Sequence, residues 1–412
     1  MKSLVIIKGL AKSEKLKWVQ EEGLGNYFLD LDVFQKIYSI PELISPSIDV
    51  LNRSYGSLVH KRFMEALILK MGKGCLIVVD MNEEPISAVE LLAKIHGYTV
   101  FYNIQSVPQD FCNKPEDYHL DWKPKKQRDN LEAEVKSFMS TRYDNKIIIK
   151  NYQDVLNWWE EHETVINLKR KDRITHVSDL HSHWNIWKEL IPGISSKIVI
   201  HHGDYIDGPE KGGSFKMIRE IIKDNSQGKY FWLEGNHEIR LRRYLGWRII
   251  SSSGSSKTIS ELLYDLLPDD FLQTTATEFE KLTIRECRAW LDELNNKLKT
   301  HIVICRDGIN YICTHAGIKL IEQLTPKHIG NAIYGNRDVD KYDKEFSFRN
   351  KGTGFLSIHA HCKYPHSWDT NKYSNVVNID PEDEFSVVMF YNNKDNWKFK
   401  VYGKDNNNSK EL

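Results

Sequence analysis

Five short polar motifs, each directly after a predicted strand, constrain the fold of this sequence more than any other feature. They are Asp179-Leu-His181, Gly203-Asp204-Tyr-Ile-Asp207, Gly235-Asn236-His237-Glu238, Thr314-His315-Ala-Gly317 and His359-Ala-His361. Loops that follow the strands of an α/β sheet converge on one edge, so side chains from five separate loops can meet in space. The pattern therefore predicts one sheet edge that gathers the functional groups.

The strands expected in this part of the chain are short apolar runs, and the later ones have no helix between them. Strand candidates are residues 174–178, 197–201, 230–233, 301–305, 310–313, 354–358, 376–379, 385–390 and 398–402. Residues 257–299 are predicted to be a helical insertion. Consecutive strands without helices favour a mixed sheet or a two-sheet sandwich.

The amino-terminal part alternates strands and helices instead. We expect strands at residues 3–7, up to 30–32, at 75–79 and at 98–102, and helices at 15–22 and 85–95. This alternation predicts a parallel sheet covered on both faces. The overall fold class is therefore α/β, with this domain spanning residues 1–110.

Residues 111–170 are predicted to be a basic helical linker. Residues 122–128 and 167–173 each hold four basic residues in seven, and residues 155–161 have helical character. The second domain is then expected at 171–403, followed by a polar, disordered tail at 404–412.

Composition narrows the functional classes. Lys+Arg and Asp+Glu both number 57, which excludes a histone-like basic coat but not a local basic groove. The 6 cysteines form no C-x-x-C pair, which indicates reduced thiols in a cytosolic setting. No apolar run approaches the roughly 18 residues of a membrane span, and the apolar stretch at the amino terminus is too short for a signal peptide. The sequence predicts a cytoplasmic protein without a membrane partner.

The five motifs supply carboxylates, imidazoles and one amide oxygen. That mixture suits Mn, Fe, Zn or Ni better than calcium. The set is large enough for two ions, and Asp204 can bridge them. Two ions together can activate a nucleophile and neutralise a phosphoryl oxygen. We expect two divalent cofactors, Mn first, with Fe, Zn and Ni as alternatives.

With these motifs, residues 174–402 resemble the calcineurin-like metallophosphoesterases, in particular the PPP-type phosphatases with their GDxxD, GNHE and HAG motifs. The resemblance implies a β-sandwich flanked by helices, in which a hydroxide bridging two metals attacks a phosphate ester. It assigns one metal to Asp179, His181, Asp204 and His361. It assigns the other metal to Asp204, Asn236, His315 and His359. It also makes His237 the general acid, oriented by Asp207.

The sequence departs from that family pattern in the residues expected to grip phosphate. Gly208-Pro209 follows Asp207 where the family has an arginine, and PPP-type enzymes generally lack the second histidine of His359-Ala-His361. Arg337, in Tyr334-Gly-Asn-Arg337, is the first candidate for phosphate contact. Three arginines after the GNHE motif are further candidates, although a solvated basic face would explain them equally well: Arg240, Arg242 and Arg243.

Residues 5–18 align with a strand and the GxxGSGKST loop of P-loop kinases. Gly9, Ser13 and Lys15 remain, whereas Lys12 and Glu14 replace two glycines and Leu16 replaces the Mg-binding hydroxyl. Residues 28–34 and 77–82 resemble later segments of polynucleotide kinases. The resemblance therefore implies a degenerate kinase-like fold that does not bind ATP. A working kinase and an unrelated α/β domain are the alternatives.

Fusions of this kind occur in bacterial and viral RNA-repair enzymes, so the resemblance places the protein in a bacterial or infected-host cytoplasm. The predicted function is a metal-dependent phosphoesterase that acts on phosphorylated nucleic-acid ends, with RNA favoured and 2′,3′-cyclic phosphates included. The basic stretches with Trp122, Trp158 and Trp159 would contact such a chain, or would serve only solubility and helix packing. The alternatives are a PPP-like protein phosphatase, a dinucleoside polyphosphate hydrolase, and a scaffold. The oligomeric state stays open.

Overall fold

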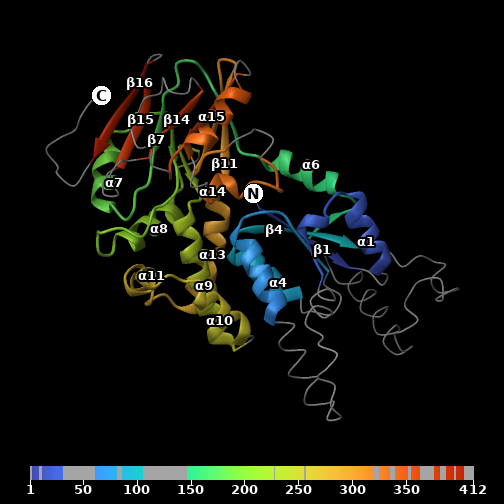
Figure 1. Ribbon diagram of the computed structural model, residues 1–412. Coiled ribbons are helices and arrows are strands. Elements are labelled where there is room, and N and C mark those ends of the chain that lie inside the picture. Colours follow the sequence, from blue (N-terminus) through green and yellow to red (C-terminus); the bar gives the residue numbers. More distant parts are fainter. Residues whose placement is uncertain are drawn as a thin grey trace, which may run out of the picture. The chain divides into compact units, whose positions relative to one another are not determined.

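The chain forms two compact units, Lys2–Glu161 and His162–Leu412 (Figure 1). The computed structural model describes residues 2–8, 12–30, 61–80, 86–104, 146–226, 228–254, 257–318, 324–334, 339–350, 354–361, 375–380, 387–393 and 396–402. Gly9, Arg337, residues 122–128 and the tail 404–412 lie outside the described residues.

The first unit is built on a five-stranded parallel sheet in the order β2-β3-β1-β4-β5. Its strands are β1 (Lys2–Lys8), β2 (Phe28–Leu29), β3 (Ile77–Asp80), β4 (Tyr98–Ile104) and β5 (Ile147–Ile149). Its helices are η1 (Gly25–Tyr27), α1 (Lys12–Glu21), α4 (Ile86–Ile95) and α6 (Tyr152–His162), and residues 61–72 are also helical. The predicted parallel sheet is confirmed.

The core of this unit explains the position of β5 and α6, which both come from the segment predicted as a linker. Tyr152 and Val155 of α6 are buried in the same cluster as Val5 and Phe101 of the sheet. Trp158 packs edge-on against Phe101, with ring centroids 5.3 Å apart. Trp159 is 5% exposed. Trp158 therefore packs inside the unit, as the helix-packing alternative expects, and Trp159 is buried, so neither is an exposed stacking platform.

The second unit contains two sheets that pack face to face. The larger sheet has the order β10-β9-β8-β7-β15-β16 and the smaller β14-β13-β12-β11-β6, with both parallel and antiparallel pairs. The larger consists of β10 (Leu298–Lys299), β9 (Tyr230–Leu233), β8 (Ile198–His201), β7 (Ile174–Val177), β15 (Val387–Asn393) and β16 (Asn396–Tyr402). The smaller consists of β14 (Val376–Asn378), β13 (Phe355–His359), β12 (Ile309–Thr314), β11 (His301–Arg306) and β6 (Val165–Leu168).

Alternate residues of the two sheets share one buried core. Ile198 and Ile200 of the larger sheet pack with Ile302, Ile304 and Ile358 of the smaller one. The alternation follows from the two-residue repeat of a strand, which sends every second side chain to the same face. The two-sheet sandwich expected from the sequence is confirmed, with β6 added as an edge strand from the predicted linker.

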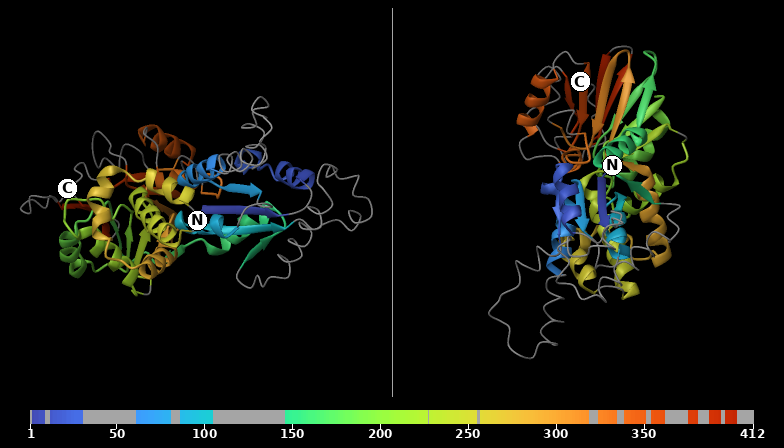
Figure 2. Two further views of the ribbon diagram at one scale, coloured as in Figure 1. Left: turned by 90° about the horizontal axis from the view of Figure 1, so that it is seen from below. Right: turned by 90° about the vertical axis from the view of Figure 1, so that its right-hand side faces the viewer.

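Helices complete the second unit. They are α7 (Trp184–Leu190), η5 (Ile191–Gly193), α8 (Gly213–Lys223), α9 (Asn236–Ser253), α10 (Lys257–Asp265), α11 (Asp269–Gln273), α12 (Thr275–Glu278), α13 (Ile284–Lys297), α14 (Asn331–Tyr334) and α15 (Val339–Arg349). The elements α10 to α13 agree with the predicted helical insertion, and α13 packs on α8 and α9. Figures 1 and 2 show α10 and α11, in yellow, at the end of this unit away from β15 and β16, in red. Among the helices of the described part of the chain, none combines the length and apolar character needed to cross a membrane.

Candidate metal centre

The five sequence motifs meet at one edge of the sandwich. Loops after β7, β8 and β9 of the larger sheet carry three of them, and loops after β12 and β13 of the smaller sheet carry the other two. Two groups of ligand-type atoms form there, each within 4.8 Å of one another: His181, Asp204 and His237, and Asp204, His315 and His361. Because Asp204 belongs to both groups, its carboxylate connects them.

Distances around Asp204 define the geometry. Its Oδ2 lies 3.4 Å from His315 Nε2, 3.6 Å from His237 Nε2 and 3.8 Å from His361 Nδ1. Asn236 Oδ1 lies 3.1 Å from His315 Nε2. Asp179 Oδ1 lies 4.0 Å from His181 Nε2. The structure therefore brings all the predicted ligands to this edge, with one exception described below.

The backbone at this edge is strained. Seven non-glycine residues of the described chain have positive φ, and six of them belong to these loops: Asp179, His181, Ser182, Asp204, Asp207 and His361. A positive φ is unfavourable for residues other than glycine and persists only where surrounding contacts enforce it. Such strain collects at functional sites, so its location supports a functional role for the edge.

Two glycines of the motifs are required by close approach. A Cβ on Gly203, whose φ is +91°, would lie 2.7 Å from both Gly235 N and His315 Nδ1. A Cβ on Gly235 would lie 2.2 Å from Asp204 Oδ1. Any larger residue at either position would push the Asp204 loop away from its neighbours.

Glu238 holds the Asp204 loop in place, a role that the sequence reasoning missed. Its buried carboxylate accepts hydrogen bonds from the backbone N–H groups of Asp204 at 3.0 Å, Tyr205 at 2.8 Å and Gly235 at 2.9 Å. The last bond caps the amino terminus of α9. The signal was present in the sequence, because a glutamate three residues after an N-cap position is the spacing of a capping box.

Hydrogen bonds to backbone carbonyls fix which ring nitrogen carries the proton in two of the ligand histidines. His181 Nδ1–H donates to Ile206 O at 3.1 Å, and His315 Nδ1–H donates to His202 O. Each Nε2 is then left with a lone pair directed toward the carboxylates. Burial lowers the pKa of both histidines, which favours the neutral form that a metal requires.

Buried negative charge completes the case for cations. Asp179 is 4% exposed, and its Oδ2 accepts no hydrogen bond from any residue that the structure describes. Burial, followed by the charges of Asp380 and Asp204, raises the pKa of Asp179, and burial together with Asp204 raises the pKa of Glu238 to about 8. Carboxylates crowded together away from water are costly unless a cation compensates them. The residues present therefore fit divalent metal ions.

His237 is arranged as an acid beside this centre. Its Nδ1 lies 2.7 Å from Asp207 Oδ2, while its Nε2 faces Asp204. Burial opposes the charged ring, but the charge of Asp204 and the hydrogen bond to Asp207 outweigh it and raise the pKa of His237. His237 is therefore both turned toward the edge and held toward its protonated form.

His359 is the predicted ligand that belongs to neither of the two groups of ligand-type atoms around Asp204. Its Nε2 lies 3.0 Å and 3.1 Å from the two carboxylate oxygens of Asp343 on α15, and its Nδ1 bonds to Ala360 O. Instead, His361 stands beside His315, with ring centroids 4.6 Å apart. The geometry thus differs from the resemblance-based assignment, because both nitrogens of His359 are occupied by protein.

The candidate arginines differ in their burial and in their partners. Arg242 is 2% exposed and pairs with Glu234 at 2.7 Å, so it supports the core of the unit. Burial lowers the pKa of Arg243, which lies near Tyr334. Arg240 is at the edge itself, with Nη1 2.9 Å from Asp207 Oδ2 and 3.3 Å from His237 Nδ1. Arg337 lies outside the described residues.

Comparison with known proteins agrees with this geometry. The family model described as calcineurin-like phosphoesterase matches residues 172–390, and the chain belongs to that family. It is therefore a metal-dependent phosphoesterase. A comparison with curated proteins returned no match.

Two solved structures show distant likeness. One is a protein serine/threonine phosphatase from Saccharomyces cerevisiae with similarity to human phosphatase PP5, at 9% identity and TM-score 0.37, covering 66% of this chain and 95% of that one. The other is a conserved protein from Streptococcus pneumoniae described as a predicted phosphoesterase, at 11% identity and TM-score 0.27, covering 58% of this chain and 97% of that one. The family match, rather than these likenesses, assigns the chain.

Asp204→Asn removes the charge shared by the two groups. We expect the purified variant to lose most of its bound metal and its turnover to fall by orders of magnitude, because a neutral amide cannot compensate two cations. Elemental analysis and a phosphatase assay measure both effects. The control is Asp224→Asn, which alters a hydrogen bond to Trp232 away from the edge. Normal metal content and activity in Asp204→Asn would contradict the shared role.

His237→Ala should slow the hydrolysis of esters with alkoxide leaving groups about 100-fold or more, but that of nitrophenyl esters far less, because only the former need a proton.

Asp207→Asn should move the alkaline limb of the pH profile of kcat/KM to lower pH. The sign follows from the structure: Asp207 raises the pKa of His237, so its loss makes the acid deprotonate earlier. pH–rate profiles test this, with the surface variant Asp172→Asn as control. An unmoved limb would exclude His237 as the titrating acid.

Proposed function

We propose that this protein is a dinuclear metal-dependent phosphoesterase that hydrolyses phosphate esters at nucleic-acid ends, with RNA favoured and 2′,3′-cyclic phosphates included. The observation that carries the proposal is the pair of groups of ligand-type side chains that share Asp204, one of which includes His237. Two ions bound there would activate water and neutralise charge on the phosphoryl oxygens. Imidazole and carboxylate ligands suit Mn, with Fe, Zn and Ni as alternatives.

The ligands divide between the two ions according to the geometry. Asp179 and His181 would hold one ion with Asp204. Asn236, His315 and His361 would hold the other with Asp204. This division moves His361 to the second ion and leaves His359 as a residue that joins β13 to α15 through Asp343.

The acid step follows from the position of His237. Its Nε2–H is directed to the edge where the ester oxygen would lie, and Asp207 keeps the ring oriented and protonated. When the phosphorus–oxygen bond breaks, this proton would pass to the leaving oxygen. The predicted roles of His237 and Asp207 thus remain as proposed from the sequence.

Arg240 is the proposed phosphate-binding group in place of the arginine that the family has after Asp207. It reaches the same carboxylate from α9, three residues after His237, and its side chain is 25% exposed. An arginine fork matches the geometry of phosphate oxygens. The sequence difference at Gly208 is therefore compensated, in this proposal, from a neighbouring helix.

Substitution of Arg240 tests this assignment. Arg240→Ala should raise KM and weaken inhibition by inorganic phosphate about 10- to 100-fold, the cost of losing a charge-assisted hydrogen bond. Arg240→Lys should retain part of the affinity. Arg219→Ala on the exposed side of α8 is the matched control. If phosphate inhibition is unchanged in Arg240→Ala, the contact does not exist.

The basic stretch 167–173 gives the nucleic-acid proposal no support near the chemistry. It leads into the first residue of β7, whereas Asp179 follows the last, so the stretch lies at the opposite end of that strand. The nucleic-acid proposal is supported instead by the order of elements in the first unit. Lys15 on α1 follows β1 in a parallel sheet, and this order agrees with the kinase-like resemblance from which the proposal comes.

The first unit is proposed to have lost nucleotide binding. Lys15 is 2% exposed, and its Nζ lies 2.8 Å and 2.7 Å from the two carboxylate oxygens of Asp80. The ammonium that would contact phosphate is thus paired with a carboxylate. We expect no ATP binding at micromolar concentrations in calorimetric titration. Micromolar affinity, or phosphorylation of 5′-hydroxyl RNA that Lys15→Ala abolishes, would show a working kinase.

A substrate panel tests the function. The Mn-loaded full chain is assayed on nitrophenyl phosphate in competition with RNA bearing a 3′-phosphate or a 2′,3′-cyclic phosphate, a phosphopeptide, or a dinucleoside tetraphosphate. The proposal predicts that the RNA ends compete best and are hydrolysed. Preferential turnover of the phosphopeptide or dinucleotide would replace the substrate assignment. No hydrolysis of any ester, with Asp204→Asn as the baseline, would favour the scaffold alternative.

A further inference from the structure

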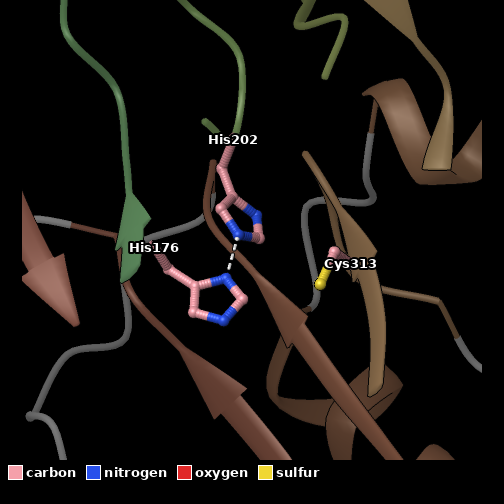
Figure 3. Close-up of side chains that lie close together, drawn as sticks. All are labelled: His176, His202 and Cys313. Atoms are coloured by element: carbon pink, nitrogen blue, oxygen red, sulfur yellow. Dashed lines mark hydrogen bonds between the residues drawn. The ribbon is translucent and has the colours of Figure 1, made fainter. Parts of the chain in front are cut away.

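A polar layer closes the sandwich core directly beneath the metal centre. His176, His202 and Cys313 occupy inward-facing positions that continue the series of Ile174, Ile200 and Tyr311. Figure 3 shows the three side chains close together, with His176 on β7 and His202 in the loop after β8 of the larger sheet, and Cys313 on β12 of the smaller one. All three are fully buried. Burying an imidazole is costly unless its nitrogens form hydrogen bonds, so two histidines at such positions need a physical reason.

The hydrogen bonds of this layer fix the protons on both rings. His202 Nδ1 lies 2.8 Å from Thr314 O, and a carbonyl only accepts, so Nδ1 carries the proton. His202 Nε2 is then an acceptor, and His176 Nδ1 donates to it at 3.0 Å (Figure 3).

A second hydrogen bond runs in the opposite direction between the same two loops. His315 Nδ1–H donates to the backbone oxygen of His202, while the His202 side chain donates to the backbone oxygen of Thr314. The imidazole of each loop therefore donates a hydrogen bond to the backbone of the other loop. The pair joins the loop that carries Asp204, from the larger sheet, to the loop that carries His315, from the smaller sheet.

We propose that His202 is a positioning residue for the metal centre, and that His176 sets its tautomer. The Nδ1–H bond to Thr314 holds the end of β12 so that His315 Nε2 stays 3.4 Å from Asp204 Oδ2 and 3.1 Å from Asn236 Oδ1. This inference rests on the proposed dinuclear centre and adds a requirement to it: the two sheets must be held in register at the point where the shared carboxylate meets the second group of ligands.

The same three side chains offer a competing interpretation. One ligand atom from each lies within 4.8 Å of the others, and two imidazoles with a thiolate can bind a transition metal. Binding would require the His176–His202 hydrogen bond to break, although both His202 nitrogens already have protein partners. We therefore favour the hydrogen-bonded arrangement and make the metal a measurable outcome.

The test compares two amides of different reach. Asn at 202 can place its N–H donor where His Nδ1 stands, because the same number of bonds separates it from the backbone, whereas Gln places it one atom further out. Manganese affinity of the full-length chain is measured by calorimetry, and the unfolding midpoint is measured with and without Mn. We expect His202→Gln and His202→Leu to weaken affinity about 10- to 100-fold, as substitutions behind metal ligands do. His202→Asn should stay within a few-fold of the unsubstituted protein.

A neighbouring histidine provides the control. His201 is equally buried but faces outward, stacked on Trp232 with ring centroids 4.0 Å apart. His201→Leu should lower the unfolding midpoint without weakening Mn affinity. Equal weakening in His201→Leu, or equal affinities in the Asn and Gln variants, would overturn the positioning role. Loss of one metal per chain in Cys313→Ser would also overturn it, by showing a metal in the layer itself. If the unsubstituted protein binds no Mn, the proposed function fails, a result separate from the variant comparisons.

Discussion

The carboxylate of Asp204 is the constraint on which the rest of the structure depends. Its Oδ1 accepts the backbone N–H of His237 at 3.1 Å, and its Oδ2 faces imidazoles that follow strands of both sheets. One carboxylate can meet these groups only if the two sheets are packed in a fixed register. The buried isoleucines between the sheets therefore serve the site as well as stability, because a shift of one sheet would separate His315 and His361 from Asp204. The positive φ of Asp204 and the absence of a side chain at Gly203 are local consequences of the same requirement.

Electrostatics then give similar side chains different roles. Burial lowers the pKa of His181 and His315, whose second nitrogens donate to carbonyls, so they are suited to bind metal. For His237 the nearby Asp204 and Asp207 outweigh burial and raise the pKa, so it is suited to donate a proton. The groups around each ring, and not the residue type, therefore determine whether a histidine is suited to bind metal or to donate a proton. Such differences are typical of sites in which the environment moves the pKa values of neighbouring titratable groups apart.

The sequence predicted the edge correctly because polar residues after apolar strands have few other structural explanations. It did not predict the different fates of His359 and His361. A spacing of two places both on one face of a strand, but β13 ends at His359. His361 lies beyond the strand with a positive φ, and its Nδ1 is 3.8 Å from Asp204 Oδ2. Asp343, the partner of His359, comes from α15 and follows no local pattern. His202 was equally hidden, since its role appears only when Thr314 is beside it. The strands β5 and β6 were not predicted, because each is short and adjoins strongly charged sequence that resembles a linker.

The first unit buries the side chain of Lys15 within a fold that has its own apolar core. Its core contains Val5, Val78 and Phe101, which lie on three neighbouring strands of the parallel sheet. A lysine buried to 2% exposure still requires a negative partner, because an isolated ammonium in a low-dielectric interior is costly. Asp80, at the end of the adjacent strand β3, supplies that charge in this chain. The ammonium of Lys15 is thus stabilised by the protein itself. The pairing with Asp80 therefore explains how the side chain of Lys15 can be buried on α1.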